Sequence, residues 1–135
     1  MSQAFDCERT LPSCPGYWLP SSKYKVFKRF TDIPAPARTY CLLDEHPDSI
    51  NAGGFANQMV EPGNYAAIRI IDFPASYHNG AAGITFMDGH AEIHKWRDPR
   101  TKPPIRYADN ILTLNIASPN NLDMVWLSDR TTVKK

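Results

Sequence analysis

The chain has 135 residues, of which 42% are hydrophobic and 21% are charged, and these are the values of one ordinary globular domain. They exclude chain-wide disorder, a collagen-like repeat and a disulfide-dense miniprotein. The net charge of +1 argues against a dedicated nucleic-acid-binding protein. No apolar run approaches the roughly 20 residues of a membrane span, and no secretion signal is visible. We therefore expect neither nucleic acid nor a membrane as a partner of this chain.

Proline and cysteine usage adds two expectations. The 12 prolines predict short elements joined by long irregular loops, because proline lacks a backbone donor and breaks helices. Cys7 and Cys14 enclose a short Pro-containing loop that a disulfide would close, which would imply an oxidising compartment. Three free thiols in a cytosolic protein fit the sequence equally well. Cys41 lies in an apolar run and is expected in the core.

In chain order, residues 1–22 are predicted to form an irregular arm, 23–132 a single globular domain and 133–135 a frayed tail. Residues 23–31 fit a strand or a helix, with Tyr24, Val26 and Phe30 facing inward. The short apolar run 39–44 predicts a buried strand, because it is bounded by residues that end regular structure.

The later elements are a second strand over 65–72, a strand over 111–117 and a short helix within 120–130. Asn120 or Asn121 would cap the helix, and Asp123 suits its first turn. Its buried stripe is expected to hold Leu122, Val125 and Trp126. The fold class predicted is α+β, mostly β, with a small antiparallel or mixed sheet, long Pro-rich loops and a short C-terminal helix.

The strongest local pattern is a β-hairpin over 83–96, in which two β-rich runs flank Asp88-Gly89. A two-residue turn would pair Phe86 with Ala91 and Ile84 with Ile93. Directly paired residues share a face of a sheet. One face would then be the apolar set Ile84, Phe86, Ala91 and Ile93, and the other would be the polar set Thr85, Met87, His90, Glu92 and His94.

Two polar clusters are candidates for metal binding. Asp44, Glu45 and His46 follow the first predicted strand, in a loop that Pro47 stiffens, and His78, Asp88 and His90 belong to the hairpin region. Mixed carboxylate and imidazole ligands suit Zn, Mn, Fe or Ni, and an all-oxygen subset suits Ca. The simpler interpretation is a solvated acidic turn and a solvated sheet face, with Asp88 acting only as a turn former.

A single site needs the two clusters to meet. If the strands that end at Asp44 and Asp88 lie parallel in one sheet, both loops emerge at the same edge, and His78 must fold back to join them. The alternative leaves His78 at the far end of the hairpin, about 17 Å of strand from Asp88, where it would only cap or hydrogen-bond locally.

Three blocks of the chain resemble a known family. A histidine, nine residues and then Asp-Gly, here His78 and Asp88-Gly89, define the prepilin-type processing-associated domain. The runs 42–55 and 120–132 also resemble this family, so the resemblance covers about residues 24 to 132. It implies a pilin-like head domain of type II secretion pseudopilins, as found in planctomycete, verrucomicrobial and lentisphaeral bacteria.

Full-length members begin with a leader and a long apolar helix that a prepilin peptidase trims. This chain shows no such helix, so we expect either a head cut from a longer protein or a shortened relative. We further expect export of the parent protein to an extracytoplasmic or cell-surface location, together with a disulfide between Cys7 and Cys14. The expected partners are other pilin-like subunits or a surface ligand, with oligomer formation.

These patterns favour a metal-stabilised, non-catalytic head domain that acts in assembly or surface binding, since bound metal stabilises a fold of short strands. The alternative is a small metal-dependent hydrolase that uses Asp44, His46, His78, Asp88 and His90, with one of Asp44, Glu45 or His46 as general base. A carbohydrate-binding module, suggested by Trp18 and Trp96, is a third interpretation.

Overall fold

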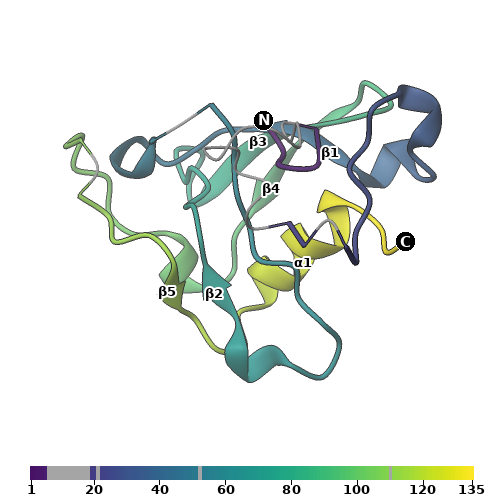
Figure 1. Ribbon diagram of the computed structural model, residues 1–135. Helices are drawn as coiled ribbons and strands as arrows, with labels where there is room; N and C mark the ends of the chain where they lie inside the picture. The colour runs from purple at the N-terminus through teal and green to yellow at the C-terminus, as the bar shows by residue number, and fades with distance from the viewer. Residues whose placement is uncertain (6–18, 21, 52, 110) are drawn as a thin grey trace.

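The computed structural model describes residues 1–5, 19–20, 22–51, 53–109 and 111–135. It contains a three-stranded and a two-stranded antiparallel sheet and one short C-terminal helix (Figure 1). The predicted class, α+β and mostly β with a small antiparallel sheet, is therefore confirmed. Among the described residues no helix has the length and apolar character that crossing a membrane requires.

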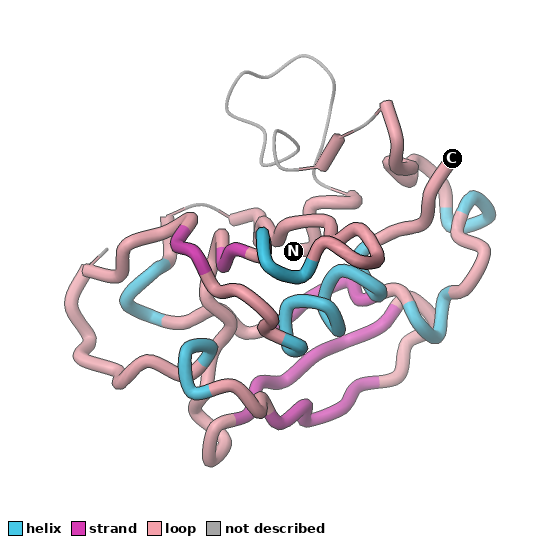
Figure 2. The backbone as a smooth tube through the Cα atoms, turned by 90° about the horizontal axis from the view of Figure 1, so that it is seen from below, coloured by secondary structure: helices cyan, strands magenta, loops and turns pink. Residues whose placement is uncertain are grey.

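The three-stranded sheet has the order β1-β3-β4, formed by Tyr40–Leu43, Ala81–Phe86 and Ala91–Lys95. The smaller sheet pairs β2, Arg69–Ile70, with β5, Ile116–Ala117. Figure 2 shows the strands and helix embedded in long loops, as the proline content predicts. The strands expected over 39–44, 65–72 and 111–117 exist, and each is shorter than its apolar run.

Short 3₁₀ turns punctuate the loops, and several begin with proline, whose fixed φ suits the first position of a helix. They are η2 (Phe30–Asp32), η3 (Pro36–Arg38), η4 (Pro47–Ser49), η5 (Tyr65–Ala67) and η6 (Pro99–Thr101).

The helix α1 spans Leu122–Thr131. Its N-cap is Asn121, as predicted, and the Asn121 side chain accepts hydrogen bonds from the backbone N–H groups of Asp123 and Met124. Of the three residues in the predicted stripe, Val125 and Trp126 are partly buried and pack against the core, whereas Leu122 does not. Leu122 is 62% exposed, and the buried residues are Asp123, Met124, Leu127, Ser128 and Thr131.

The main hydrophobic core joins both sheets to one face of α1. Trp96, which follows β4, is 1% exposed and donates its indole N–H to the carbonyl of Ala75 over 2.8 Å. Around it lie buried aromatic and aliphatic side chains from both sheets, the helix and the loops between them: Tyr40, Phe55, Ile68, Ile70, Phe73, Ala75, Ala82, Ile84, Phe86, Met124 and Leu127.

The predicted hairpin register is wrong by one residue. Thr85 pairs with Ala91 and Ile84 pairs with Glu92, so the loop holds the three residues 87–89 rather than two. Gly89 has a φ of +95°, which is typical of a three-residue hairpin loop that ends in a left-handed residue. The shift turns Ile93 to solvent, where it is 61% exposed, while Ile84 and Phe86 stay buried as predicted.

Three further expectations differ from the structure. Residues 23–31 form neither a strand nor an α-helix: Tyr24 makes an isolated bridge with Lys134, and the segment ends in the start of η2. Tyr24 is buried as predicted, whereas Phe30 is 58% exposed. The same bridge orders the chain end that we expected to fray. Cys41 is half-buried rather than a core residue, and Cys7 and Cys14 lie outside the described residues.

Candidate functional site

Asp44 and His78 lie near the start of strand β3, whereas Asp88 and His90 lie beyond its other end. β1 is antiparallel to β3, with Tyr40 opposite Phe86 and Leu43 opposite Ile84, so the parallel arrangement that would have joined the clusters is wrong. Asp44, just after β1, lies beside the start of β3 and accepts a hydrogen bond from the Gly83 N–H at 3.1 Å. Asp88 follows the other end of β3, so the structure does not bring these two carboxylates together.

His78 belongs to the turn that precedes β3. Its backbone N–H donates to the carbonyl of Ala81, and Asn79 and Gly80 between them have φ values of 53° and 80°. Positive φ at both central residues is the pattern of a type I′ turn, for which Asn-Gly is the preferred sequence. His78 and Asp88-Gly89 thus bracket β3 with one tight turn at each end, and the alternative placement of His78 at the far end of the hairpin is the observed one.

Of the six candidate residues, only Asp88 and His90 contact each other through their side chains. Asp88 Oδ1 lies 2.6 Å from His90 Nδ1 and also accepts the His90 backbone N–H. Hydrogen bonding to His90 holds the pKa of Asp88 below its usual value. The His90 ring stacks on Phe86 with ring centroids 4.3 Å apart. The pair is an ordered Asp–His dyad on an exposed hairpin tip.

His46 is fully buried and uses both of its ring nitrogens within the protein. Nδ1 accepts the Asp48 backbone N–H at 3.2 Å, and Nε2 lies 3.1 Å from the Pro103 carbonyl. A carbonyl is only an acceptor, so the proton sits on Nε2. His46 therefore connects the loop after β1 to the loop after β4 and has no ring nitrogen left for a metal.

Asp48 lies two residues further on and anchors the same two loops. Its carboxylate is fully buried and accepts the Arg106 N–H at 2.7 Å and the Ala108 N–H at 2.8 Å. Burial alone would raise the pKa of Asp48, but the backbone hydrogen bonds from Arg106 and Ala108 outweigh it and lower the pKa.

Glu45 has the opposite surroundings. Its Oε1 atom is buried and makes no hydrogen bond with the described part of the chain. Burial, followed by the nearby Asp72 carboxylate, raises the pKa of Glu45 to about 8. Asp72 is 5% exposed, and burial raises its pKa too, against the hydrogen bond that it accepts from the Ala56 N–H.

These positions do not supply one ion with a shared set of ligands. Across the described ranges, no group of three or more His, Cys, Asp or Glu side chains is placed to hold a metal ion. Both ring nitrogens of His46 are used within the protein, and Asp44 and Asp88 each give one carboxylate oxygen to a hydrogen bond at different ends of β3. A metal centre built from all six predicted residues therefore does not fit this arrangement.

Sequence reasoning missed Asp123 as a loop anchor. Its buried carboxylate, in the first turn of α1, accepts the backbone N–H groups of Arg97 and Asp98 at 2.9–3.1 Å. It also missed a ring stack in which the centroids of the His94 and Trp126 rings are 3.7 Å apart. The Cζ atom of Arg130 lies 4.0 Å from the centroid of the same Trp126 ring. No local sequence pattern around Asp123, His94 or Trp126 indicates these contacts, because the partners lie far apart in the chain.

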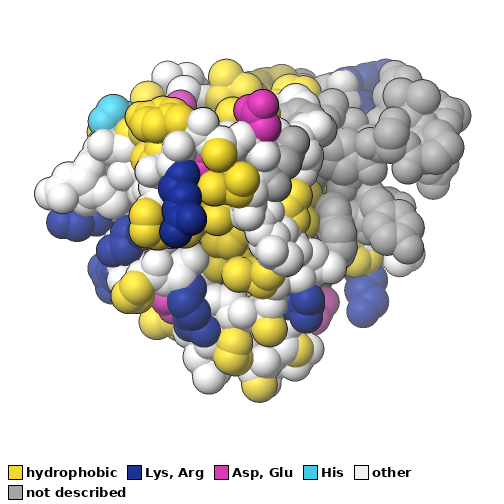
Figure 3. All heavy atoms as spheres, turned by 90° about the vertical axis from the view of Figure 1, so that its left-hand side faces the viewer, with side chains coloured by type: hydrophobic (Ala, Val, Ile, Leu, Met, Phe, Trp, Pro, Cys, Tyr) yellow, Lys and Arg dark blue, Asp and Glu magenta, His cyan; other side chains and the backbone are white. Residues whose placement is uncertain are grey.

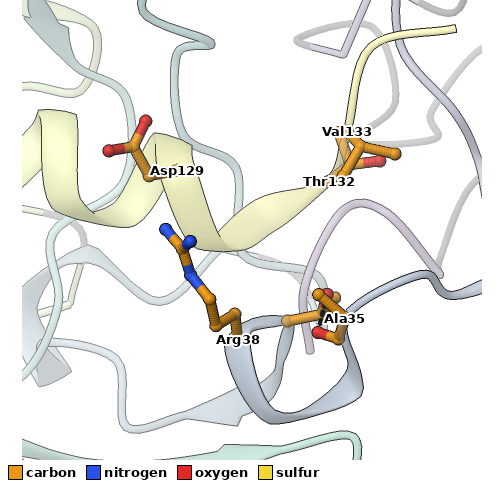
Figure 4. Close-up of a pocket in the computed structure, with 6 residues that line it drawn as sticks. Ala35, Arg38, Asp129, Thr132 and Val133 are labelled. Carbon is orange, nitrogen blue, oxygen red and sulfur yellow. Dashed lines mark hydrogen bonds between the residues drawn. The ribbon is translucent and has the colours of Figure 1, made fainter.

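The aromatic signals for carbohydrate binding are not supported at Trp96, whose ring is buried in the core, and Trp18 lies outside the described residues. A cavity of about 370 Å³ lies between η3 and the end of α1, where Arg38 points toward the helix that carries Asp129 (Figure 4). None of the six candidate residues lines it; the lining residues are Ala35, Arg38, Thr39, Asp129, Thr132 and Val133.

No family model matches the chain, and neither a curated protein nor a solved structure matches it. The resemblance to the prepilin-type domain rests on the residues of the sequence alone.

Proposed function

We propose that this chain is a non-catalytic, pseudopilin-like head domain that acts in extracytoplasmic assembly or surface binding. The observation that carries the proposal is that side chains which could act in catalysis are engaged in hydrogen bonds to the backbone. Asp44, His46 and Asp48 hold loops through hydrogen bonds to the backbone, which is the work of a scaffold.

The surface supports the same proposal. Several large hydrophobic side chains are exposed, including Tyr107 at 78% and Ile93 at 61%. On the face shown in Figure 3, hydrophobic side chains alternate with Lys and Arg side chains. Exposed apolar groups bordered by charges are typical of surfaces that meet a protein partner.

A chimera tests the proposal directly. The head of a type II secretion pseudopilin is replaced by this chain, downstream of the pseudopilin's own leader and apolar helix. We expect the chimera to be trimmed by the prepilin peptidase and to enter the assembled structure. The matched control carries Trp96→Ala, which removes the core ring and should abolish entry. A folded, trimmed chimera that never enters the assembly would contradict the proposal.

The hydrolase remains the alternative, and the Asp88–His90 dyad is the observation that favours it. A carboxylate that holds a histidine by one ring nitrogen orients the other nitrogen toward solvent. Ester, phosphate and glycoside substrates are offered to the purified chain with and without added Zn²⁺, Mn²⁺ or Ca²⁺. Turnover that His90→Gln abolishes in a folded protein would favour the enzyme over the head domain.

A further inference from the structure

Strand β4 is the edge of the three-stranded sheet, and its outward backbone groups are arranged for pairing. The N–H of Trp96 donates to Gly80 and the carbonyl of His90 accepts from Phe86, so the even-numbered residues of β4 face β3. The N–H and C=O groups of Ala91, Ile93 and Lys95 therefore point away from the sheet. None of them forms a backbone hydrogen bond with another described residue.

The side chains of this edge divide between two environments. His94 packs on Trp126 of α1, so the even-numbered face of β4 is covered by the helix. Ile93 lies on the opposite face, with its Cδ1 atom 4.0 Å from the point where a side chain on Gly83 would begin, and it is 61% exposed. A second strand laid along β4 would give Ile93 a cross-strand neighbour on the face opposite the helix.

We infer that β4 pairs with β4 of a second copy of this chain, antiparallel and about a two-fold axis at Ile93. In this register Ala91 faces Lys95 of the second copy and Ile93 faces Ile93. The three outward positions of each chain then exchange hydrogen bonds with the other. An isologous contact of this kind closes on itself as a dimer with one continuous six-stranded sheet.

Complementarity between a carboxylate and an imidazole, which can donate a ring N–H to it, favours this partner and this register. Glu92 lies opposite His94 of the second copy, and His94 lies opposite Glu92, in the closely spaced non-hydrogen-bonded pairs. Moving the two-fold axis by one residue toward the hairpin tip places Glu92 opposite Glu92. Moving it one residue the other way places His94 opposite His94. Of these three registers, only the one centred on Ile93 places Glu92 opposite His94.

Lys95 would normally protect this edge, because a lysine on an edge strand discourages pairing with a strand of another chain. Centred on Ile93, the dimer places Lys95 opposite Ala91, where a small side chain leaves room for the lysine stem to reach solvent. The lysine therefore disfavours other registers more than this one.

The inference deepens the proposed function, since self-pairing of heads is one form of assembly. Its test is sedimentation of the purified chain from low to high micromolar concentration, with amide exchange measured by NMR. We expect a species of twice the 15.2 kDa chain mass. In that dimer the amides of Ala91, Ile93 and Lys95 become protected, whereas those of Glu92 and His94 are protected in the monomer as well.

Ile93→Lys places two lysines against each other and removes the apolar contact, so the dimer dissociation constant should rise roughly 100-fold. The control is Leu42→Lys, an equally exposed change on the distant strand β1, which should leave the dimer intact. Ile93→Pro is a second variant, because it removes an N–H that faces away from β3 and so blocks pairing while leaving the hairpin hydrogen bonds in place.

A wild-type chain that stays monomeric throughout, or a dimer that survives Ile93→Lys and Ile93→Pro, would overturn the inference. An Ile93→Lys chimera that still enters the pseudopilin assembly would refute assembly through β4 and leave the proposed function standing. If no folded chimera enters the assembly while the dimer forms in solution, the proposed function would be refuted and the β4 dimer would stand.

Discussion

Glu45 and Asp48 stand three residues apart in the same loop after β1, yet the protein treats their carboxyl groups in opposite ways. Asp48 receives two backbone N–H groups from the loop after β4, and its pKa is lowered. Glu45 has a buried Oε1 atom without a donor among the described residues and a neighbouring carboxylate, Asp72, and its pKa is raised to about 8.

The difference between these two carboxyl groups follows from the hydrogen-bond donors that Asp48 has and Glu45 lacks among the described residues. Both groups lose solvent, which disfavours the anion in each case. At Asp48 the loop over 103–108 returns two hydrogen bonds to the anion, whereas at Glu45 the nearest charged group is another acid. The acidic residues of the segment 44–48 therefore do not all carry the same charge, although they are neighbours in the sequence.

Loss of the Asp48 carboxylate should have the largest effect. Asp48→Asn replaces one acceptor oxygen by a donor and leaves a buried N–H of Arg106 or Ala108 without a partner, which is strongly unfavourable. We expect the melting temperature, followed by circular dichroism, to fall by roughly 10 °C.

The control for this variant is Asp129→Asn, at an exposed carboxylate on α1 that accepts no hydrogen bond from the described part of the chain. That change should leave the melting temperature within a degree or two of wild type. Equal losses in both variants would mean that Asp48 is no more of an anchor than a surface acid.

The second prediction uses pH, because the two carboxyl groups should act on opposite limbs of the stability curve. The raised pKa of Glu45 gives stability that is fully present below about pH 4.3, its unfolded value, and is lost as pH rises through about 8. The lowered pKa of Asp48 gives stability that is present above about pH 3.9 and is lost as pH falls further.

Glu45→Gln should therefore flatten the decline between pH 5 and 8 and raise the melting temperature by a few degrees at pH 8, with little change at pH 4. Denaturant titrations across this range measure the effect. A Glu45→Gln variant whose stability still falls in parallel with wild type would remove Glu45 as the source of the decline, leaving Asp72 as the next acid to replace.

The contrast between these loops also explains what the sequence could and could not predict. The cap at Asn121 was predictable because a cap bonds to residues two and three positions away. Asp48 bonds to amides 58 and 60 positions away, and Asp123 to amides 25 and 26 positions away, so no local pattern announces either anchor.

In the hairpin, prediction from the sequence is limited even for residues that are close together in the chain. Its strands and its Asp88-Gly89 turn follow from alternation and turn chemistry, but Asp-Gly suits loops of two residues and of three. That one-residue ambiguity decided whether Ile93 faced the core or solvent. The predicted meeting of Asp88 with the loop after β1 was wrong because β1 is antiparallel to β3, and that direction depends on the path of the whole intervening loop.

A smaller effect is expected where Asp44 meets β3. A side chain on Gly83 would begin 2.8 Å from Asp44 Oδ2, so Gly83→Ala must displace the carboxylate that accepts the Gly83 N–H. We expect a loss of about 1 kcal/mol in the free energy of unfolding, measured by urea denaturation. In an Asp44→Ala background the same change should be neutral or stabilising, since glycine is unfavourable within a strand. Equal losses in both backgrounds would show that the contact with Asp44 is not the cause.

The smallest effect is expected at Asp88, which like Asp48 has a lowered pKa but owes it to an exposed partner. Its main partner is the His90 ring, and both side chains are more than a third exposed, so solvent competes for the hydrogen bond. Asp88→Asn should change the melting temperature by only a degree or two, because asparagine also suits a hairpin turn and can still accept the His90 N–H. The local effect should be larger: release of the ring from Asp88 should loosen its stack on Phe86, which the ring-proton chemical shifts of both residues in NMR report directly. A melting loss as large as that of Asp48→Asn would mean that the hairpin tip is an anchor of the fold, and the distinction between buried and exposed acceptors drawn from Asp48 would not hold.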